Sequence, residues 1–280
     1  MLDEFHHQDP RPEVDRPTPP KRLDRARISV VIPSRTQPSQ GRFLARSIAS
    51  IRAQILDGAA DFEIIVSIDR GAIPPTLDGL EGVRFVEADA RGQAAALNAG
   101  AAVARGDCLA FLEDDDEWHP RKSAYALRVL EHADFVSSTQ LEVDESGNAL
   151  QVNDFPTPSG WLMPMQTWRL IGPFDTHYRW HLDNEWLGRL GNSSLRRIHL
   201  VQAEALREPD VLSRRPHLMQ CLRAGGPHVR LCGHPVEVPL VRRMTHAQSG
   251  MGQIERNESL KAEARLEGHR LIDRFARFPW

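Results

Sequence analysis

The 280-residue chain has few cysteines, no surplus of basic residues and no long apolar run. An odd number of widely spaced cysteines predicts reduced thiols in a reducing compartment; they are Cys108, Cys221 and Cys232. Because 35 Lys and Arg stand against 38 Asp and Glu, nothing indicates a nucleic-acid partner. No apolar stretch approaches the roughly 20 residues of a membrane span, and the N-terminus is too polar for a signal peptide. We therefore expect a cytoplasmic protein without a transmembrane segment, and its composition leaves a homo-oligomer open.

Residues 1–26 have almost no aliphatic side chains with which to build a core. This segment is charged and carries five prolines, Pro10, Pro12, Pro17, Pro19 and Pro20. Such a composition predicts a flexible N-terminal arm. The rest of the chain has the balance of a globular protein, since 41% of all residues are hydrophobic and 26% are charged.

After the arm, short β-branched runs alternate with helical repeats. Buried strands are predicted at 28–32, 62–68, 83–86, 108–112 and 135–138, and helices at about 44–55, 93–104 and 121–131. This alternation predicts an α/β fold with a mostly parallel sheet and helices on both faces. Ligands of such sheets bind at the carboxyl ends of the strands.

The pattern is less regular after residue 140. We expect a hairpin turn at 147–148, a helix at 183–190 and a strand at 236–241. Residues 254–275 predict an amphipathic C-terminal helix that packs through Leu260, Leu266, Leu271, Ile272 and Phe275. The predicted organisation is one domain over 27–250, with halves 27–140 and 141–250, followed by a helical segment over 251–280.

Five adjacent acids, Glu113–Glu117, directly follow a predicted buried strand and end in Trp-His-Pro. Packed together they repel one another, and a cation would neutralise them. Mn²⁺ and Mg²⁺ prefer oxygen ligands and keep positions open for phosphate oxygens. A metal here could stabilise a diphosphate leaving group. The alternative is a solvated acidic loop. Asp69 also follows a predicted strand, where it could simply form a turn.

Six segments, in this order and spacing, resemble the family 2 glycosyltransferases with the GT-A fold. They are Ile28–Ser34, Phe62–Asp69, Gly92–Gly100, Gly106–Pro120, Gly172–Asp175 and His181–Trp186. The resemblance covers about residues 28–190. It implies a GT-A-like, metal-dependent hexosyltransferase-type enzyme that transfers a sugar, with inversion, from a nucleoside-diphosphate sugar to an acceptor hydroxyl. The expected donor is a UDP-sugar, bound by the half at 27–140, and the acceptor, unidentified, would bind the half at 141–250.

The resemblance also implies roles for single residues on the donor side. Pro33, Ser34 and Asp69 would line the nucleoside pocket, with Arg91 and Gln93 reaching the nucleotide. The DxD motif of the family aligns with Glu113-Asp114-Asp115. Asp115 would bind the metal, and Glu113 would contact ribose or metal-bound water unless Asp114 takes that role. Two departures from the family pattern are Ile68, in place of an aspartate, and Glu113 itself.

On the acceptor side, Asp183 matches the aspartate of the family's Glu-Asp motif, with Leu182 in place of the glutamate. It is the expected general base, with Glu185 in reserve; the alternative is a helix N-cap at Asp183. The resemblance implies that His246 ligates the metal or touches the diphosphate, although a surface histidine is the common alternative. Arg243, with Arg242, could neutralise the diphosphate.

Two further features lie in the later half of the chain. Gly250 and Gly252 would let their segment move as a lid over the donor. Four tryptophans could stack on sugars or pack in the core; they are Trp161, Trp168, Trp180 and Trp186.

The sequence bears on three alternative classes of protein. A nucleotidyltransferase would need a glycine-rich basic loop that residues 33–37 lack, and a dehydrogenase would need Gly-x-Gly-x-x-Gly after the first strand. A non-catalytic nucleotide-sugar-binding protein of the same fold stays open because of the departures at Ile68, Glu113 and Leu182.

Overall fold

A computed structural model describes residues 23–36, 41–56, 58, 60–75, 79–207, 215, 218, 228–234 and 238–279. Most of the predicted arm and Cys221 lie outside these residues. The described chain begins with the short helix η1 (Leu23–Arg25), in which Leu23 is buried. The described cysteines, Cys108 and Cys232, are free thiols, and burial raises the pKa of Cys108 to about 12.

The main sheet has eight strands in the order β11-β10-β6-β9-β4-β1-β2-β3. All neighbouring pairs are parallel except those of β9, which runs antiparallel to β4 and β6. The predicted mostly parallel sheet is therefore confirmed. The strands are β1 (Arg27–Ser34), β2 (Asp61–Ile68), β3 (Arg84–Glu87), β4 (Cys108–Phe111), β6 (Phe135–Ser138), β9 (Leu162–Pro164), β10 (Arg197–Gln202) and β11 (Val229–His234).

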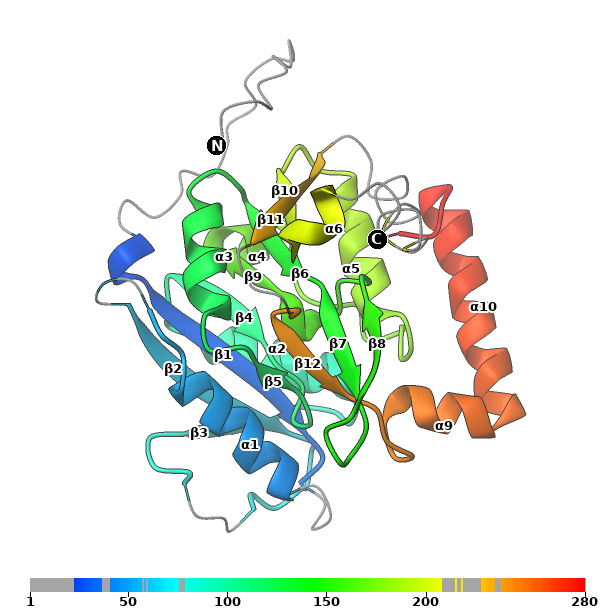
Figure 1. Cartoon of the computed structure of the whole chain (residues 1–280). Helices are drawn as coiled ribbons and strands as arrows, with labels where there is room; N and C mark the ends of the chain where they lie inside the picture. The colour runs from blue at the N-terminus through cyan, green and yellow to red at the C-terminus, as the bar shows by residue number, and fades with distance from the viewer. Residues whose placement is uncertain are drawn as a thin grey trace.

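Helices cover both faces of this sheet (Figure 1), as predicted. Alternate side chains of β1 point to opposite faces, so that Val30 and Ile32 lie in one hydrophobic cluster and Val31 in the other. The first cluster includes residues of α1 (Gly41–Arg52) and α3 (Lys122–Leu130). The second includes residues of α2 (Gln93–Val103), α4 (Met165–Ile171) and α5 (Leu182–Gly191). The described chain also contains η3 (Pro158–Gly160) and α6 (Ala203–Arg207).

A second, four-stranded sheet lies beside the first and was not predicted (Figure 1). Its strands, in sheet order, are β5 (Glu117–Trp118), β12 (Val241–Met244), β7 (Gln140–Val143) and β8 (Ala149–Asn153). The hairpin between β7 and β8 confirms the predicted turn, in which Gly147 has a φ of 86°. Of the strand predicted at 236–241, residues 236 and 237 lie outside the described residues, 238–240 are not in a strand, and β12 begins at Val241.

The C-terminal segment forms two helices, α9 (Gly250–Arg256) and α10 (Glu258–Phe275), where one was predicted. The break falls at Asn257, whose side chain accepts hydrogen bonds from the amides of Ser259 and Leu260 and so caps α10. Leu271 and Phe275 are buried as predicted, but the expected packing of Leu266 and Ile272 is wrong, since these are 52% and 45% exposed. Among the described helices, none is long and apolar enough to cross a membrane.

Candidate active site

The carboxyl ends of three central strands meet at one edge of the main sheet. Ser34 at the end of β1 pairs with Ile68 at the end of β2, and Val31 pairs with Phe111 at the end of β4. This register brings Asp69, which follows β2, and the acidic loop Glu113–Glu117, which follows β4, to the same edge. Asp69 and the acidic loop therefore lie at the same edge of the sheet, as the parallel arrangement predicts.

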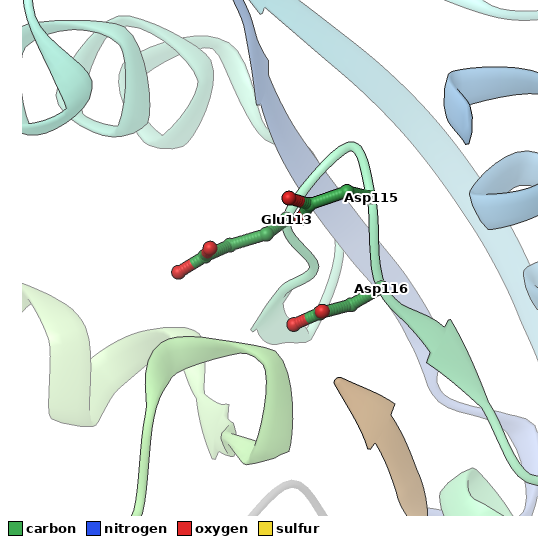
Figure 2. A group of neighbouring side chains, drawn as sticks. All are labelled: Glu113, Asp115 and Asp116. Atoms are coloured by element: carbon green, nitrogen blue, oxygen red, sulfur yellow. The ribbon is translucent and has the colours of Figure 1, made fainter. Parts of the chain in front are cut away.

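Three carboxylates of the acidic loop converge. Oxygen atoms of Glu113, Asp115 and Asp116 lie within 4.8 Å of one another, and Figure 2 shows the three side chains on the same side of the loop. Burial, reinforced by the charge of Asp115, raises the pKa of Glu113 to about 7. A nearby positive charge would stabilise the ionised form of such a carboxyl group, so the loop is a candidate divalent-cation site.

Asp116 differs from its two neighbours because its carboxylate is already engaged. It is 1% exposed, and it accepts hydrogen bonds from Ser159 Oγ at 2.6 Å and from the Met244 amide at 3.0 Å. Ser159 Oγ in turn accepts from the Glu113 amide at 3.1 Å. Asp116 therefore ties the acidic loop to η3 and β12, which leaves Glu113 and Asp115 as the available carboxylate ligands.

Asp114 stands apart from the three converging carboxylates. Its carboxylate is hydrogen-bonded to Ser34, and burial followed by the charge of Asp115 raises its pKa to about 7. One of its oxygens, Oδ2, is buried with no hydrogen-bond partner among the described residues. Pro33 precedes Ser34 on the same strand and is partly buried. Asp114 thus faces the predicted nucleoside side rather than the other carboxylates.

The start of α2 connects Asp69 to the acidic loop. Asp69 Oδ1 accepts a hydrogen bond from the Gly92 amide at 2.9 Å, and Gln93 Nε2 donates to Glu113 Oε1 at 3.2 Å. Arg91 is exposed beside them. Gly92 has a φ of 115°, which favours glycine at this turn. The predicted donor-side residues are therefore gathered at one edge, although Ile68 is only 3% exposed and belongs to the core.

The small sheet brings Arg243 to the acidic loop. Although burial opposes it, the carboxylates of Glu113, Asp116 and Glu142 raise the pKa of Arg243. Arg243 Nη1 donates to Glu142 Oε1 at 2.9 Å. Arg242 instead points to the β7–β8 turn, where it donates to the Gly147 carbonyl. Arg243 is therefore the cation of this pair that faces the acidic loop.

His246 lies just beyond β12 and contacts the acidic loop directly. Its Nε2 is 2.8 Å from Asp115 Oδ2, and its Nδ1 is 3.2 Å from Gln248 Oε1. The hydrogen bond with Asp115 raises the pKa of His246. The His246 imidazole therefore lies beside the acidic loop, although it is not one of the three residues whose ligand atoms converge.

Asp183 lies in the first turn of α5, near enough to Glu113 and Arg243 for their charges to interact with its own. Burial raises its pKa against the opposing effects of His181 and Arg243, and its charge in turn raises that of Glu113. The N-cap of α5 is His181, so the alternative of Asp183 as the cap is wrong. A carboxylate whose pKa is raised by burial is suited to accept a proton.

Glu185, the reserve base, is placed differently. Its side chain is fully buried, and its two oxygens accept from Arg189 Nε at 2.8 Å and Nη2 at 2.9 Å. Arg274 Nη1 lies 3.0 Å from the same carboxylate. A buried carboxylate held by two arginines forms a structural ion pair, so Asp183 alone is kept as the candidate base.

Three of the four tryptophans belong to the core. Trp161, Trp168 and Trp186 are at most 7% exposed and pack in one cluster. Trp180 is partly exposed, and its indole nitrogen has no hydrogen-bond partner among the described residues. It is the remaining aromatic candidate for an acceptor contact.

The two glycines of the predicted lid lie in the first turn of α9. A Cβ at Gly252 would be 2.4 Å from the His246 carbonyl oxygen, so glycine allows a close approach there. A Cβ at Gly250 would meet only Trp180, at 3.8 Å.

The family profile described as "Glycosyl transferase family 2" matches residues 29–197, which is more than half of the chain. The chain therefore belongs to this family. A curated relative, an uncharacterized glycosyltransferase of Nostoc sp., is 32% identical over 118 residues, which is 39% of this chain and 34% of that protein. The matched part thus spans about a third of the relative's length.

Solved structures of S. aureus TarS have a similar fold. One, in complex with UDP-GlcNAc, matches with a TM-score of 0.54 and 11% identity over 80% of this chain and 60% of that chain. Another matches with a TM-score of 0.51 and 10% identity over 85% of this chain and 39% of that chain. Together with the sheet order, these similarities establish the GT-A fold and a glycosyltransferase of family 2.

Proposed function

We propose that this protein transfers a sugar from a nucleoside-diphosphate sugar to an acceptor hydroxyl, with inversion, and that a UDP-sugar is the donor. The observation that carries the proposal is the gathering of Glu113, Asp115, Arg243 and Asp183 at one edge of the sheet. The TarS structures support the choice of UDP, because a protein of the same fold is seen with UDP-GlcNAc.

On the donor side, Ser34, Asp69 and Asp114 would hold the nucleoside, since they lie where β1, β2 and β4 end. Arg243 lies beside the carboxylates and would face the diphosphate. Gln93, already bonded to Glu113, lies at the first residue of α2, where free backbone N–H groups favour an anion.

Glu113, Asp115 and His246 would hold a divalent cation, Mn²⁺ or Mg²⁺. When bound, the cation supplies positive charge that stabilises the departing diphosphate. Asp116 is not a ligand in this proposal, because Ser159 and the Met244 amide occupy its oxygens. Its part is to keep the acidic loop in place.

The transfer itself is a single displacement. The acceptor hydroxyl oxygen forms a bond to the anomeric carbon while the bond from that carbon to the diphosphate oxygen breaks. The hydroxyl proton passes to the Asp183 carboxylate, and the nucleoside diphosphate leaves with the electron pair. Attack opposite to the leaving group inverts the anomeric centre. Trp180, three residues before Asp183, would contact the acceptor.

The test measures the release of UDP from UDP-N-acetylglucosamine with Mn²⁺, in the presence of a panel of hydroxyl acceptors. We expect Asp183→Asn to lower kcat by about 10²–10⁴-fold, the usual contribution of a general base, and to leave the dissociation constant of UDP unchanged. The control is Asp273→Asn, an exposed aspartate on α10, which should keep the wild-type rate.

The second candidate is a binding protein that has kept the fold without transfer. It is favoured by Ile68 and Glu113, which stand where the family carries aspartates, and by Leu182, which stands where it carries a glutamate. It predicts tight UDP binding and no turnover with any acceptor or with water. Equal rates for the wild type and Asp183→Asn would instead reject Asp183 as the base.

A further inference from the structure

Glu267 on α10 makes an unusual contact with the segment that leads into α5. Its side chain is 4% exposed, and its carboxylate accepts hydrogen bonds from three consecutive backbone amides. These are the amides of Arg179 at 2.9 Å, Trp180 at 2.8 Å and His181 at 3.1 Å. Three amide donors on one carboxylate fix the path of that backbone, because each bond constrains the same short segment.

The same helix also holds the His181 side chain. His181 Nε2 lies 3.1 Å from the Ala264 carbonyl oxygen, and Nδ1 lies 3.1 Å from Asn184 Oδ1. The side-chain nitrogen of Asn184, Nδ2, donates to the Pro279 carbonyl, so the side-chain oxygen of Asn184 is the atom that faces His181. The two ring nitrogens of His181 therefore link the start of α5 to α10.

Two contacts along the rest of α5 join it to α10. Arg274 bonds the buried Glu185, and Phe275 packs so closely on Gly188 that a Cβ there would lie 2.7 Å from its ring. Figure 1 shows α9 and α10 at one side of the molecule, joined at a bend. The helix α10 lies entirely outside the residues that the family profile matches.

We propose that Glu267 is a positioning residue for the reaction: by binding the amides of residues 179–181, it sets the start of α5 and hence the place of Asp183 and Trp180. The inference rests on the proposed role of Asp183 as the base. A misplacement of about 1 Å in a reacting group can cost on the order of 100-fold in rate, so α10 would act on catalysis although Glu267 itself touches no substrate.

The first measurement does not need turnover. Hydrogen–deuterium exchange of the full chain should show faster exchange at residues 179–183 in Glu267→Gln than in the wild type, because a carboxamide offers one acceptor oxygen for three amides. The matched control is Glu263→Gln, one turn earlier on α10, since among the described residues Glu263 pairs with the Arg179 side chain, at 3.7 Å. Unchanged exchange in Glu267→Gln would overturn the proposal.

The second measurement separates positioning from general destabilisation. In the UDP-N-acetylglucosamine assay, Glu267→Gln should lower kcat by about 10- to 100-fold, with little change in the donor KM, and Glu267→Asp should recover part of the loss. In an Asp183→Asn background, Glu267→Gln should add almost nothing. An equal loss in both backgrounds would reject action through Asp183. If the wild type turns over no donor, the proposed function fails, and the exchange result alone decides whether Glu267 positions the segment.

Discussion

At the scale of single residues, the site divides into groups that would meet substrates and groups that hold them. The family motifs mark Asp115 and Asp183 in the sequence, and both lie at the candidate site. Asp116, Ser159 and Glu267 could not be picked out in this way, since each makes its contact with a residue far away in the chain, such as the bond of Asp116 to the Met244 amide. Asp116 is also one of five adjacent acidic residues, so the sequence does not distinguish its role from theirs.

His199 is a buried polar residue, and its hydrogen bonds lie outside the candidate site. Its Nδ1 is 2.9 Å from Ser137 Oγ and its Nε2 is 3.3 Å from Thr139 Oγ1, and Thr139 donates to Asp154. Thr139 Oγ1 can therefore accept from Nε2–H while Ser137 donates to Nδ1, which satisfies the neutral ring. Burial lowers the pKa of His199 to about 4, from a usual value of 6.5.

This shift makes stability depend on pH in a defined direction. Below pH 6.5 the unfolded chain protonates His199 and the folded chain does not, so the free energy of unfolding falls as the pH drops from 6.5 towards 4. Between pH 7.5 and 5 this histidine should cost roughly 2 kcal/mol. Urea unfolding at both pH values should show that loss in the wild type and in the exposed-site control His132→Gln. The loss of unfolding free energy should be about 2 kcal/mol smaller in His199→Gln. An equal loss in the wild type and both variants would contradict the lowered pKa of His199.

At the scale of elements, five of the eight strands of the main sheet, β1 to β4 and β6, were predicted because their apolar runs are strong, whereas β9, β10 and β11 were not predicted. The small sheet was not predicted either, since β5 has two residues and β12 reads Val-Arg-Arg-Met, with no alternation that distinguishes a strand from a loop. The long C-terminal helix was predicted without its break, because the apolar periodicity carries across Asn257 while the cap depends on its side chain.

Gly100 tests how tightly α2 lies on the main sheet. A Cβ there would be 2.3 Å from Val31 Cγ1 on β1 and 2.4 Å from Ser67 Oγ on β2. In a free helix, Ala in place of Gly would stabilise by about 1 kcal/mol, but overpacking a core costs about 1–3 kcal/mol. Because the Val31 methyl is fixed in a central strand, packing should win.

We therefore expect Gly100→Ala to lower the free energy of unfolding by about 1–2 kcal/mol. Gly250→Ala, where a Cβ meets only Trp180 at 3.8 Å, should change it by less than about 0.5 kcal/mol. Chemical denaturation at neutral pH measures both. A more stable Gly100→Ala variant would show that α2 does not press against β1 and β2 as described.

At the scale of the whole molecule, one sheet edge collects groups from three parts of the chain. The central parallel strands deliver Ser34, Asp69 and the acidic loop, the small sheet delivers Arg243, and α5, held by α10, delivers Asp183. The first part follows from parallel topology and could be predicted. The family resemblance marks Arg243 and Asp183, but their approach to this edge depends on how later segments pack, which local sequence patterns do not encode.

The most direct test of the central claim is titration calorimetry of UDP with the full chain, in Mn²⁺ and in EDTA. We expect UDP and Mn²⁺ to bind together, with a single Mn²⁺ ion per chain, and Asp115→Asn to remove the Mn²⁺-dependent part of the UDP affinity. At 100 times its dissociation constant, UDP should then stabilise the wild type by about 2.7 kcal/mol. Equal UDP affinity in Mn²⁺ and EDTA, unchanged in Asp115→Asn, would contradict a metal-assisted donor site at the acidic loop.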